Sequence, residues 1–414
     1  MAIIRPFRAV RPDKQLVEQI AALPYDVMDT AEARDMVSQN PHSFLRIDRA
    51  EINFDSDIDP HDTKVYAKAR DILDKMINNE YYLQDDSSYL YIYQQIMDGR
   101  KQTGLVCCTS IDDYLHNVIK KHENTRPAKE QDRIDHITVT NAHTGPIFQT
   151  YRSQPEIEDT LTQWIHTHAP IYHFASDDGV IHNCWIIDNL AVLDKLVDLF
   201  ATVPYLYIAD GHHRSAAALK VGLNRRKENP NYHGSEEFNH FLSVLFPCDQ
   251  LQIMSYNRVV QDLAGLTKDA FLTRVSKLFT VKTATESPYQ PQEKGTFGMY
   301  LENQWYELTP KPGILNEEDP VQRLDVAILQ DNLLGPVLNI KDPRTDQRIA
   351  FVGGIRGLNE LERRVHQGMA VAFSLYPTSI DEVMDVADEN QVMPPKSTWF
   401  EPKLRSGIYL HLLE

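Results

Sequence analysis

The sequence predicts a mixed α+β fold, and three features of the 414-residue chain indicate it. Runs of β-branched and aromatic residues, such as "FLSVLF" at residues 241–246, predict buried strands. Stretches with apolar residues three or four positions apart, such as residues 65–77, predict helices with one buried face. The two patterns alternate irregularly, so we expect a mixed sheet elaborated by further α+β segments rather than a regular doubly wound sheet.

The first part of the chain contributes most of the predicted elements. Helices are predicted at residues 15–22, 30–39, 65–77 and 188–201, and a surface loop over residues 50–59. Asp98-Gly99 and Asp178-Gly179 each separate two β-rich runs, and Asp-Gly is a strong signal for a hairpin turn. We therefore expect two hairpins in the sheet.

The pattern changes after the buried strand at residues 241–246. A helix is predicted at residues 268–278, followed by a hairpin whose strands read "TFGMYL" and "WYELT". The length of the chain suggests more than one core. We expect a core domain at 1–260, a small α/β segment at 261–322 and an α+β segment at 323–414 that packs back on the core.

The charge balance restricts the classes of partner. With 59 acidic and 42 basic residues, the formal net charge is −17. This is the wrong sign for a protein that neutralises a phosphate backbone, so we expect neither nucleic-acid nor membrane partners. A small phosphorylated or hydroxylated metabolite is compatible, because local Arg and Lys residues dominate the field over a screening length of about 10 Å. The pattern does not predict an oligomeric state.

The cysteines and the N-terminus predict a cytoplasmic protein. The four cysteines lie in apolar contexts without C-x-x-C spacing, as expected for packing residues in a reduced compartment. The N-terminus "MAIIRPFRAVRP" has arginines and a proline where a signal peptide is apolar. No apolar run approaches the roughly 20 residues of a membrane span.

The most informative stretch is "PYLYIADGHHRSAAALK", residues 204–220. Its first half predicts a buried strand at 205–209, and its alanine-rich second half predicts a helix. Asp210 and Gly211 supply a sharp turn between them, since glycine tolerates positive φ. The unpaired N–H groups and the dipole of the helix then attract an anion lying beyond the strand end.

Three side chains at this turn add hydrogen-bond donors. They are His212, His213 and Arg214, and the arginine can hold a phosphate through two parallel bonds. We therefore predict a phosphate site. A simpler alternative is that Asp210 only caps the helix while the histidines face solvent. A zinc site is disfavoured, because adjacent helical residues point about 100° apart, and we predict no resident metal ligands.

Two other segments contain candidate ligand-binding groups. The charged run Lys120–Arg133, "KKHENTRPAKEQDR", is either a solvated face or a ligand contact that includes Lys121, His122, Glu123 and Arg126. If the run begins as a strand edge, Lys121 and Glu123 share one face. Asp26 in "LPYDV" either forms a local Asx turn or supplies a carboxylate that binds a metal ion or accepts a hydroxyl proton.

Basic residues also occur near the C-terminus. "MPPKSTWFEPKLRSG", residues 393–407, places Lys396, Lys403 and Arg405 around rigid prolines. Lys396-Ser397-Thr398 is similar to the end of a Walker loop, but the upstream glycines of that motif are absent. Lys396, and Arg258 in the loop after the buried strand, are therefore candidate phosphate contacts outside any known loop motif.

These motifs together resemble a known family. "RPFRAVRP", "LPYDV", "KHENTRP", "YIADGHHRSAAAL" and "MPPKSTWFEPKLRSG" identify the chain as a member of domain-of-unknown-function family ten-fifteen, over nearly its whole length. The "DGHHR" turn is also similar to the Asp-Gly-His-x-Arg signature of ParB/sulfiredoxin-like proteins, which include kinases of free serine. The resemblance implies a ParB/sulfiredoxin-like core in which residues 210–214 hold the phosphates of a nucleotide.

The resemblance implies a small-molecule kinase of serine metabolism, with ATP, ADP or pyrophosphate as donor and Mg²⁺ as cofactor. Asp210, His212, His213, Glu123 and Asp26 are the candidate catalytic residues. Gly211, Arg214, Lys121, His122, Arg126, Arg258 and Lys396 are the candidate cofactor-binding residues. The catalytic glutamate of the kinases has no matched position here, and Tyr256-Asn257 stands where relatives carry Thr-His before the arginine. A phosphatase of a small phosphoester such as phosphoserine, and a non-enzymatic nucleotide-responsive regulatory module, are the alternative functions.

Overall fold

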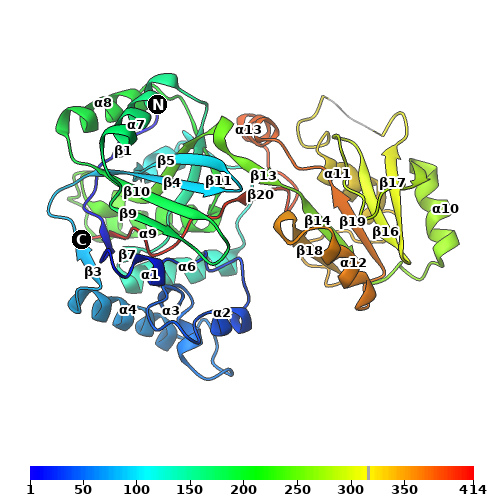
Figure 1. Ribbon diagram of the computed structural model, residues 1–414, viewed down its shortest axis with the longest axis horizontal. Helices are drawn as coiled ribbons and strands as arrows, with labels where there is room; N and C mark the ends of the chain where they lie inside the picture. The colour runs from blue at the N-terminus through cyan, green and yellow to red at the C-terminus, as the bar shows by residue number, and fades with distance from the viewer. Residues whose placement is uncertain (315–317) are drawn as a thin grey trace. The chain divides into compact units, whose positions relative to one another are not determined.

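The computed structural model describes residues 1–314 and 318–414, which fold into two compact units. The first unit comprises Met1–Leu251 and Pro402–Glu414, and the second comprises Gln252–Glu401 (Figure 1). The boundaries expected after residues 260 and 322 differ from these, because strands from both sides of residue 322 pair in one sheet. Strand β16 (Phe297–Leu301) pairs with β19 (Val371–Leu375). Only the segment Pro402–Glu414 returns to the first unit.

The first unit contains a nine-stranded sheet in the order β6-β11-β8-β12-β5-β4-β10-β9, with β1 beside β5. Its strands are β1 (Ile4–Arg5), β4 (Leu90–Met97), β5 (Arg100–Ser110), β6 (Ile119–Lys120), β8 (Ile147–Tyr151), β9 (Tyr172–Ala175), β10 (Ile181–Ile187), β11 (Leu206–Asp210) and β12 (His240–Pro247). The pairs β11–β6 and β12–β8 are parallel, and the remaining pairs are antiparallel. This mixed sheet confirms the predicted fold class.

Both predicted hairpins are present. Asp98 and Gly99 have φ angles of 51° and 79° and connect β4 to β5, as expected for a two-residue turn with both φ angles positive. Gly179, with φ of 79°, lies in the connection between β9 and β10. In both hairpins the Asp-Gly pair marked the turn correctly.

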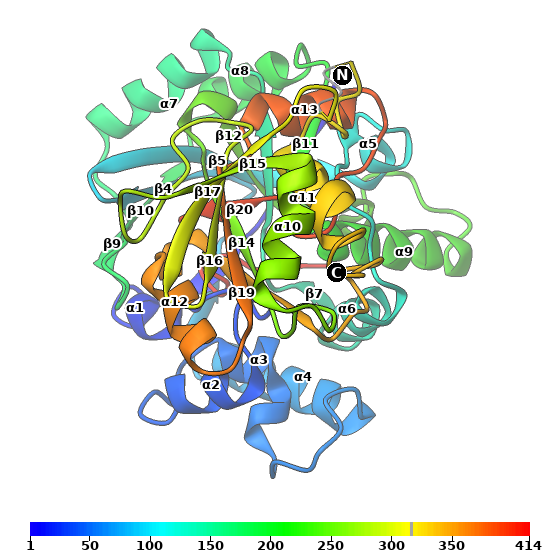
Figure 2. The same cartoon turned by 90° about the vertical axis from the view of Figure 1, so that its right-hand side faces the viewer.

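Helices cover the sheet of the first unit on two sides. Figures 1 and 2 show α7 (Pro155–Thr167) and α8 (Leu190–Phe200) on one side, and α2 (Thr30–Met36) and α4 (Thr63–Asn78) on the other. The remaining helices of this unit are α1 (Val17–Ile20), α3 (Leu45–Asp48), α5 (Ile111–Leu115), α6 (Pro127–Thr140) and α9 (His212–Glu228). Helices α6 and α9 pack together through a small apolar cluster that includes Ile137, Ala217 and Val221.

The helical layer of α1 to α4 has its own apolar core. The first unit also contains two short antiparallel strand pairs. Strand β2 (Val10–Pro12) pairs with β3 (Tyr82–Gln84), and β7 (Ala142–His143) pairs with β21 (His411–Leu412). The prediction of a surface loop at residues 50–59 was wrong for its first part. Residues Ala50–Asn53 form a 3₁₀ helix whose first three residues are buried, because Ala50 and Ile52 pack into this core.

The second unit is built on a six-stranded antiparallel sheet in the order β15-β17-β16-β19-β14-β18. Its elements are β13 (Gln252–Met254), β14 (Tyr256–Val260), α10 (Lys268–Leu278), β15 (Phe279–Thr283), β16, β17 (Gln304–Pro310), α11 (Asp325–Leu329), β18 (Ile349–Gly353), α12 (Asn359–His366), β19, α13 (Ile380–Asp388) and β20 (Trp399–Glu401). The helix predicted at 268–278 and the hairpin after it are confirmed. One apolar core includes residues of α10, α11 and α13, and a second includes Leu361 of α12.

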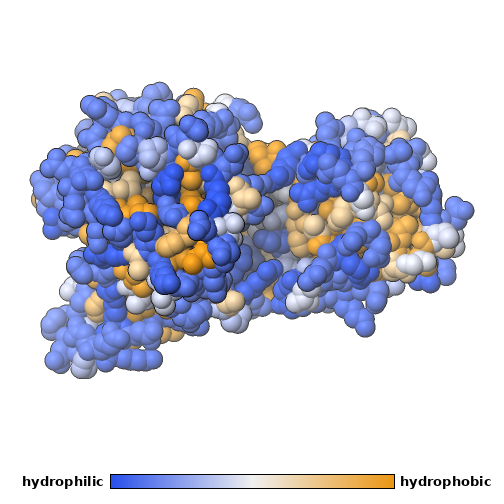
Figure 3. All heavy atoms as spheres, turned by 90° about the horizontal axis from the view of Figure 1, so that it is seen from below, coloured by the Kyte–Doolittle hydropathy of each residue, from blue (hydrophilic) through white to orange (hydrophobic). Residues whose placement is uncertain are grey.

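The surface fits the acidic composition of the chain. Hydrophilic residues cover most of the face shown in Figure 3. Among the described residues, no helix combines the length and the apolar character needed to span a bilayer. Three of the four cysteines, Cys107, Cys108 and Cys184, are buried and unbridged, as expected for packing residues.

Candidate functional site

The strand–turn–helix predicted around residue 210 is present in the first unit. Strand β11 ends at Asp210, Gly211 adopts a φ of 103°, and α9 begins at His212. A Cβ atom on Gly211 would lie 3.3 Å from the guanidinium of Arg214, so the turn requires glycine for its backbone angle and has little room for a side chain. The three candidate donors after Gly211 therefore occupy the first turn of the helix.

The first turn of α9 has N–H groups without a partner inside the helix. The first helical hydrogen bond runs from the N–H of Ser215 to the carbonyl of Gly211, at 2.9 Å. The N–H groups of His212, His213 and Arg214 precede it, which is the arrangement that attracts an anion. No side chain caps this end of the helix. The alternative in which Asp210 serves as the helix cap is therefore wrong.

Asp210 is instead paired with two cations. Its Oδ2 accepts a hydrogen bond of 3.3 Å from Nζ of Lys403 and lies 4.0 Å from Nη2 of Arg214. Burial alone disfavours the ionised carboxyl, but Lys403 and Arg214 outweigh burial and lower the pKa of Asp210 to about 2. At neutral pH Asp210 is thus a carboxylate that positions two donors, and it is not a poised proton acceptor.

His212 and His122 form a buried pair beside this carboxylate. The ring centroids lie 4.5 Å apart in an edge-to-face arrangement, and the N–H of His122 donates to Nε2 of His212 at 3.5 Å. Burial lowers the pKa of each imidazole to about 3, so both rings are neutral at pH 7. Neither ring nitrogen of His122 has a hydrogen-bond partner of good geometry.

His213 is tied to the charged run. Its Nε2 accepts a hydrogen bond of 3.0 Å from the N–H of Arg126, so the neutral ring carries its proton on Nδ1. Burial lowers the pKa of His213, while Glu123 acts in the opposite direction. Arg126 is the residue just before α6, and its side chain is exposed. The structure thus brings Arg126 and His213 together across two helix N-termini.

The expectation that Lys121 and Glu123 share a strand face was wrong. Strand β6 ends at Lys120, so residues 121–123 lie beyond its end. Strand β6 stays short because it pairs with only Leu206 and Tyr207 of β11. Lys121 is exposed and His122 is buried, whereas Glu123 is half-buried. The alternating pattern therefore places His122, not its neighbours, against α9.

Arg214 connects the turn to a cavity. Its Nη1 donates to the carbonyl of Pro146, and its buried Nε has no hydrogen-bond partner. A Cβ on Gly145 would lie 3.1 Å from Oγ of Ser406 and 3.4 Å from Nη1 of Arg214, so the space beside Arg214 is closely packed. The cavity is small, with a volume of about 20 Å³, and its lining includes Arg214, Tyr25 and Arg133. His212 and His213 are not among the residues that line it.

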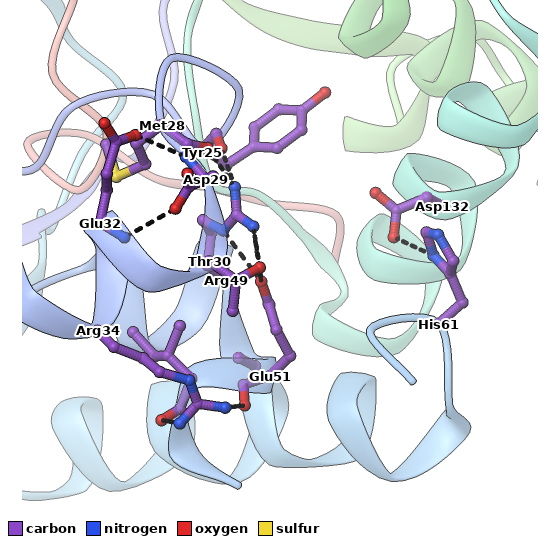
Figure 4. Close-up of polar contacts among 12 residues, drawn as sticks. Tyr25, Met28, Asp29, Thr30, Glu32, Arg34, Arg49, Glu51, His61 and Asp132 are labelled. Atoms are coloured by element: carbon purple, nitrogen blue, oxygen red, sulfur yellow. Dashed lines mark hydrogen bonds and ion pairs between the residues drawn. The ribbon is translucent and has the colours of Figure 1, made fainter. Parts of the chain in front are cut away.

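A second, larger cavity shares part of this lining. It has a volume of about 290 Å³ and shares Tyr25, Asp48, Arg133 and His136 with the first. The guanidinium of Arg133 lies 4.1 Å from the centre of the Tyr25 ring. Figure 4 shows that ring extending away from the hydrogen bonds that Arg49 makes to the carbonyls of Tyr25 and Met28. The two cavities are therefore neighbours, and the Tyr25 and Arg133 side chains line both.

Asp26 lies in the second cavity. It follows Tyr25 in a turn closed by a hydrogen bond of 3.3 Å from the N–H of Val27 to the carbonyl of Pro24. Its side chain is exposed. The lining also includes Asp132, which is 3.2 Å from Nδ1 of His61 (Figure 4) and is ion-paired with Arg133. Asp26 therefore places a carboxylate at the wall of this cavity.

Two of the candidate cofactor-binding residues lie in the second unit. Arg258 is buried, and its Nη2 donates to the carbonyl of Lys396 at 3.0 Å. Nζ of Lys396 lies 5.5 Å from the centre of the Tyr256 ring. Burial lowers the pKa of Arg258 to about 10. Inside this unit Arg258 and Lys396 therefore contact each other, and their role as phosphate contacts remains a prediction.

Sequence reasoning did not assign three residues that build the site. Lys403 was noted only as one of several C-terminal cations, although it pairs with Asp210, which lies 193 residues earlier in the sequence. Arg133 was one charge in a run, and Tyr25 was only a neighbour of Asp26. The "LPYDV" and "EPKLRSG" motifs were the available signals, but nothing in their spacing indicates that they meet β11 and α6.

The charges around Asp210 do not suit a metal ion held by the protein. Among the described residues, no three His, Cys, Asp or Glu side chains converge as metal ligands. Asp210 faces Lys403 and Arg214, which would oppose a nearby cation. A magnesium ion of a nucleotide is usually held through phosphates and one or two carboxylates, so we assign no step to protein-bound metal.

The family model described as "Protein of unknown function (DUF1015)" matches residues 4–327. No curated protein matches the chain. A solved free serine kinase in complex with AMP is 13% identical with a TM-score of 0.36, over 74% of this chain and 91% of that one. SbnI with C-terminal truncation from Staphylococcus aureus is 12% identical with a TM-score of 0.40, over 74% and 87%. These values are too low to indicate an activity.

Proposed function

The chain belongs to the DUF1015 family, whose description names no activity, and we propose from the geometry of the first unit that it is a phosphotransferase. In this proposal a nucleotide or polyphosphate donates a phosphoryl group to a small hydroxylated metabolite, with free serine as the first acceptor to test. The observation that carries the proposal is Arg214. It links the anion-attracting first turn of α9 to a cavity and retains an unpaired Nε–H.

The phosphates of the donor bind at the first turn of α9. The free N–H groups of residues 212–214 and the Nε–H of Arg214 supply hydrogen bonds to phosphate oxygens. Arg126 and Lys121 lie on exposed loops next to His213 and His122 and add positive charge. Such positioning and charge neutralisation are most of what phosphoryl transfer requires from a protein. The negative net charge of the chain does not oppose this, because the local charges are closer than a screening length.

The acceptor occupies the larger cavity, which Asp26 lines. The carboxylate of Asp26 accepts the proton of the acceptor hydroxyl. At the same time the hydroxyl oxygen forms a bond to the γ- or β-phosphorus of the donor. The bond from that phosphorus to the bridging oxygen breaks, and the shortened nucleotide or phosphate leaves with the electron pair. His122 and His212 are neutral at pH 7 and add no charge to the site. Arg133 and Tyr25 line both cavities and position the acceptor.

Phosphorus NMR of the full chain tests the proposal. Purified protein is incubated with ATP, ADP or pyrophosphate and serine, and separately with phosphoserine alone. Phosphoserine that forms only with a donor supports the phosphotransferase. Release of phosphate from phosphoserine without a donor would assign the site to a phosphatase instead. Nucleotide binding without turnover of any tested pair would leave a regulatory module.

Two variants separate the roles within the site. Asp26→Asn removes the proton acceptor, and we expect kcat to fall by roughly 10²–10⁴-fold while donor binding stays unchanged. Asp35→Asn is the matched control, because Asp35 is exposed on α2 and does not line either cavity. Equal rates for both variants would show that Asp26 is not the acceptor of the proton.

A further inference from the structure

The second unit contains an acidic cavity that is independent of the site described above. It has a volume of about 530 Å³, and its lining consists of Lys294, Gly295, Arg323, Asp325, Ile328, Asp381, Glu382 and Asp385. These residues come from the loop before β16, from the segment leading into α11, from α11 itself and from α13. Four carboxylates face two cations, so the cavity has an excess of negative charge.

Asp325 is the residue that points to a ligand. Only 7% of Asp325 is exposed. Its Oδ1 accepts a hydrogen bond of 2.9 Å from the N–H of Gly295, whereas its buried Oδ2 has no partner. A buried carboxyl oxygen without a partner is costly, and a donor from a ligand would satisfy it. Asp325 therefore offers an unused acceptor inside the cavity.

The other charged residues of the lining indicate the charge of the ligand. Lys294 is ion-paired with Glu382, and Arg323 is paired with Asp385 at 2.5 Å. Asp381 has no ion-pair partner among the described residues. Two carboxylates, Asp325 and Asp381, thus remain for a ligand with positive charge. The cavity selects a cation.

The distribution of the carboxylates favours an extended organic cation over a metal ion. The part of the chain that the structure describes has no cluster of three possible metal ligands, so these carboxylates do not converge on one point. An adjoining cavity shares Arg323 and Asp385 and adds Glu318, Asp319, Asp388 and Glu389 to the lining. The acidic lining therefore continues beyond the first cavity. Ile328 supplies an apolar contact for a methylene chain.

We propose that this cavity binds an aliphatic polyamine, with one primary ammonium group donating to Oδ2 of Asp325 and the chain extending past Ile328 toward Asp381 and the outer carboxylates. An alkylammonium group can reach a buried carboxyl because its cross-section is no wider than a methylene chain. Its compact charge provides three donors. The binding would neutralise the excess negative charge of the lining.

The carboxyl of Asp325 gives the binding a distinctive signature. Burial and the nearby Glu382 raise its pKa to about 7, whereas Lys294 acts in the opposite direction. At pH 7 a fraction of the protein therefore carries a proton on Asp325. An ammonium placed beside this carboxyl favours the ionised form, so binding releases protons. Asp381, Asp385 and Arg323 are the other charged groups that line the cavity.

Isothermal titration of the full chain with spermidine and with putrescine tests the proposal. The titrations are run at pH 7 and 150 mM salt in two buffers of different ionisation enthalpy. We expect saturable binding with one site and a heat that depends on the buffer because protons are released. Asp325→Asn should weaken binding by about tenfold or more and abolish the buffer dependence. This change keeps the size of the side chain and the hydrogen bond from Gly295.

The matched control is Asp331→Asn, which removes the same charge from an exposed position outside the cavity lining. It should leave affinity and proton release unchanged. Equal weakening by both variants would show attraction to the overall negative charge and overturn the proposal. Absence of spermidine binding, or tighter binding of Mg²⁺ or oligolysine at the same site, would overturn it as well. Circular dichroism and thermal unfolding of each variant verify that the second unit is folded.

Discussion

At the residue scale, Asp210 shows how one neighbouring cation and one from a distant part of the sequence fix a single carboxylate. Lys403 and Arg214 hold its pKa below the ordinary value, and Asp210 in turn fixes the direction of both side chains. Arg214 can therefore present its free Nε–H without rotating away. The aspartate of the "DGHHR" motif thus acts as a positioning group for the proposed phosphate ligand.

Removal of Lys403 should destabilise the first unit in a pH-dependent way. Lys403→Met leaves the partly buried Asp210 carboxylate with Arg214 as its more distant partner. We therefore expect the free energy of unfolding to fall by about 1–3 kcal/mol at pH 7. The lowered pKa of Asp210 means that its pairing stabilises the fold above pH 3.8 and loses this effect as the pH falls toward 2. Urea unfolding at pH 7 and at pH 3 measures the difference, which should shrink at the lower pH. Lys403→Arg keeps the positive charge and should lose less stability than Lys403→Met.

Asp325 should show the opposite pH dependence. Its pKa of about 7 lies above the ordinary 3.8, so its burial destabilises the fold increasingly as the pH rises between these values. The difference corresponds to as much as roughly 4 kcal/mol. Asp325→Asn should therefore raise the unfolding temperature of the second unit at pH 8.5 and have little effect at pH 4. Calorimetry at both pH values measures this, and an equal effect at the two values would contradict the assignment.

Individual site residues were predictable only where they share a local motif. Residues 210–214 follow each other on one turn, so the sequence alone indicated that they act together. Lys403 and Arg133 reach the same region through contacts across the sheet and the helical layer, and local spacing carries no signal for such contacts. The burial of individual residues could not be predicted either. His122 and Glu123 are neighbours in a charged run, yet only His122 is buried against α9.

At the element scale, the turn between β11 and α9 determines where Arg214 points. Gly211 combines a left-handed backbone angle with close contact to the Arg214 guanidinium. The strand and the helix on either side were both predicted, because Pro204, the Asp-Gly pair and the alanine run are local signals. The start of α6 at Pro127 was missed, because the charged run obscured the proline at its first helical position.

Gly211→Ala separates backbone strain from ligand binding. The substitution should cost about 1–2 kcal/mol of stability through the left-handed angle, and it should also displace Arg214 and weaken phosphate binding. Gly99→Ala is the matched control. Gly99 also has a positive φ, of 79°, but an added Cβ would meet nothing within 4 Å. Thermal unfolding and titration with pyrophosphate should show similar strain in both variants and weaker binding only for Gly211→Ala. Weakened binding in both would contradict the role of Arg214.

At the scale of the whole molecule, the first unit depends on a segment that follows the entire second unit. Residues 402–414 supply Lys403 to Asp210 and strand β21 to β7, and they bury Tyr409 and Leu410. The sequence predicted that the whole segment 323–414 packs back on the core, whereas only Pro402–Glu414 belongs to the first unit. It did not indicate that strands on both sides of residue 322 join one sheet. Pairing of distant strands is set by tertiary contacts that no local pattern records.

Deletion of residues 402–414 should unfold the first unit and leave the second folded. The deletion removes the hydrogen bonds between the backbones of Val10 and Leu410 and the bond of 2.7 Å from the Tyr82 hydroxyl to the carbonyl of Gly407. It also exposes the apolar core of α1 to α4, which includes Leu410. Calorimetry should show loss of one transition and retention of another, because Gln252–Glu401 is continuous in sequence and has its own cores. Removal of Glu414 alone, which is exposed, should change little. If both units unfold after the longer deletion, the second depends on the first, and its acidic cavity must be studied only in the full chain.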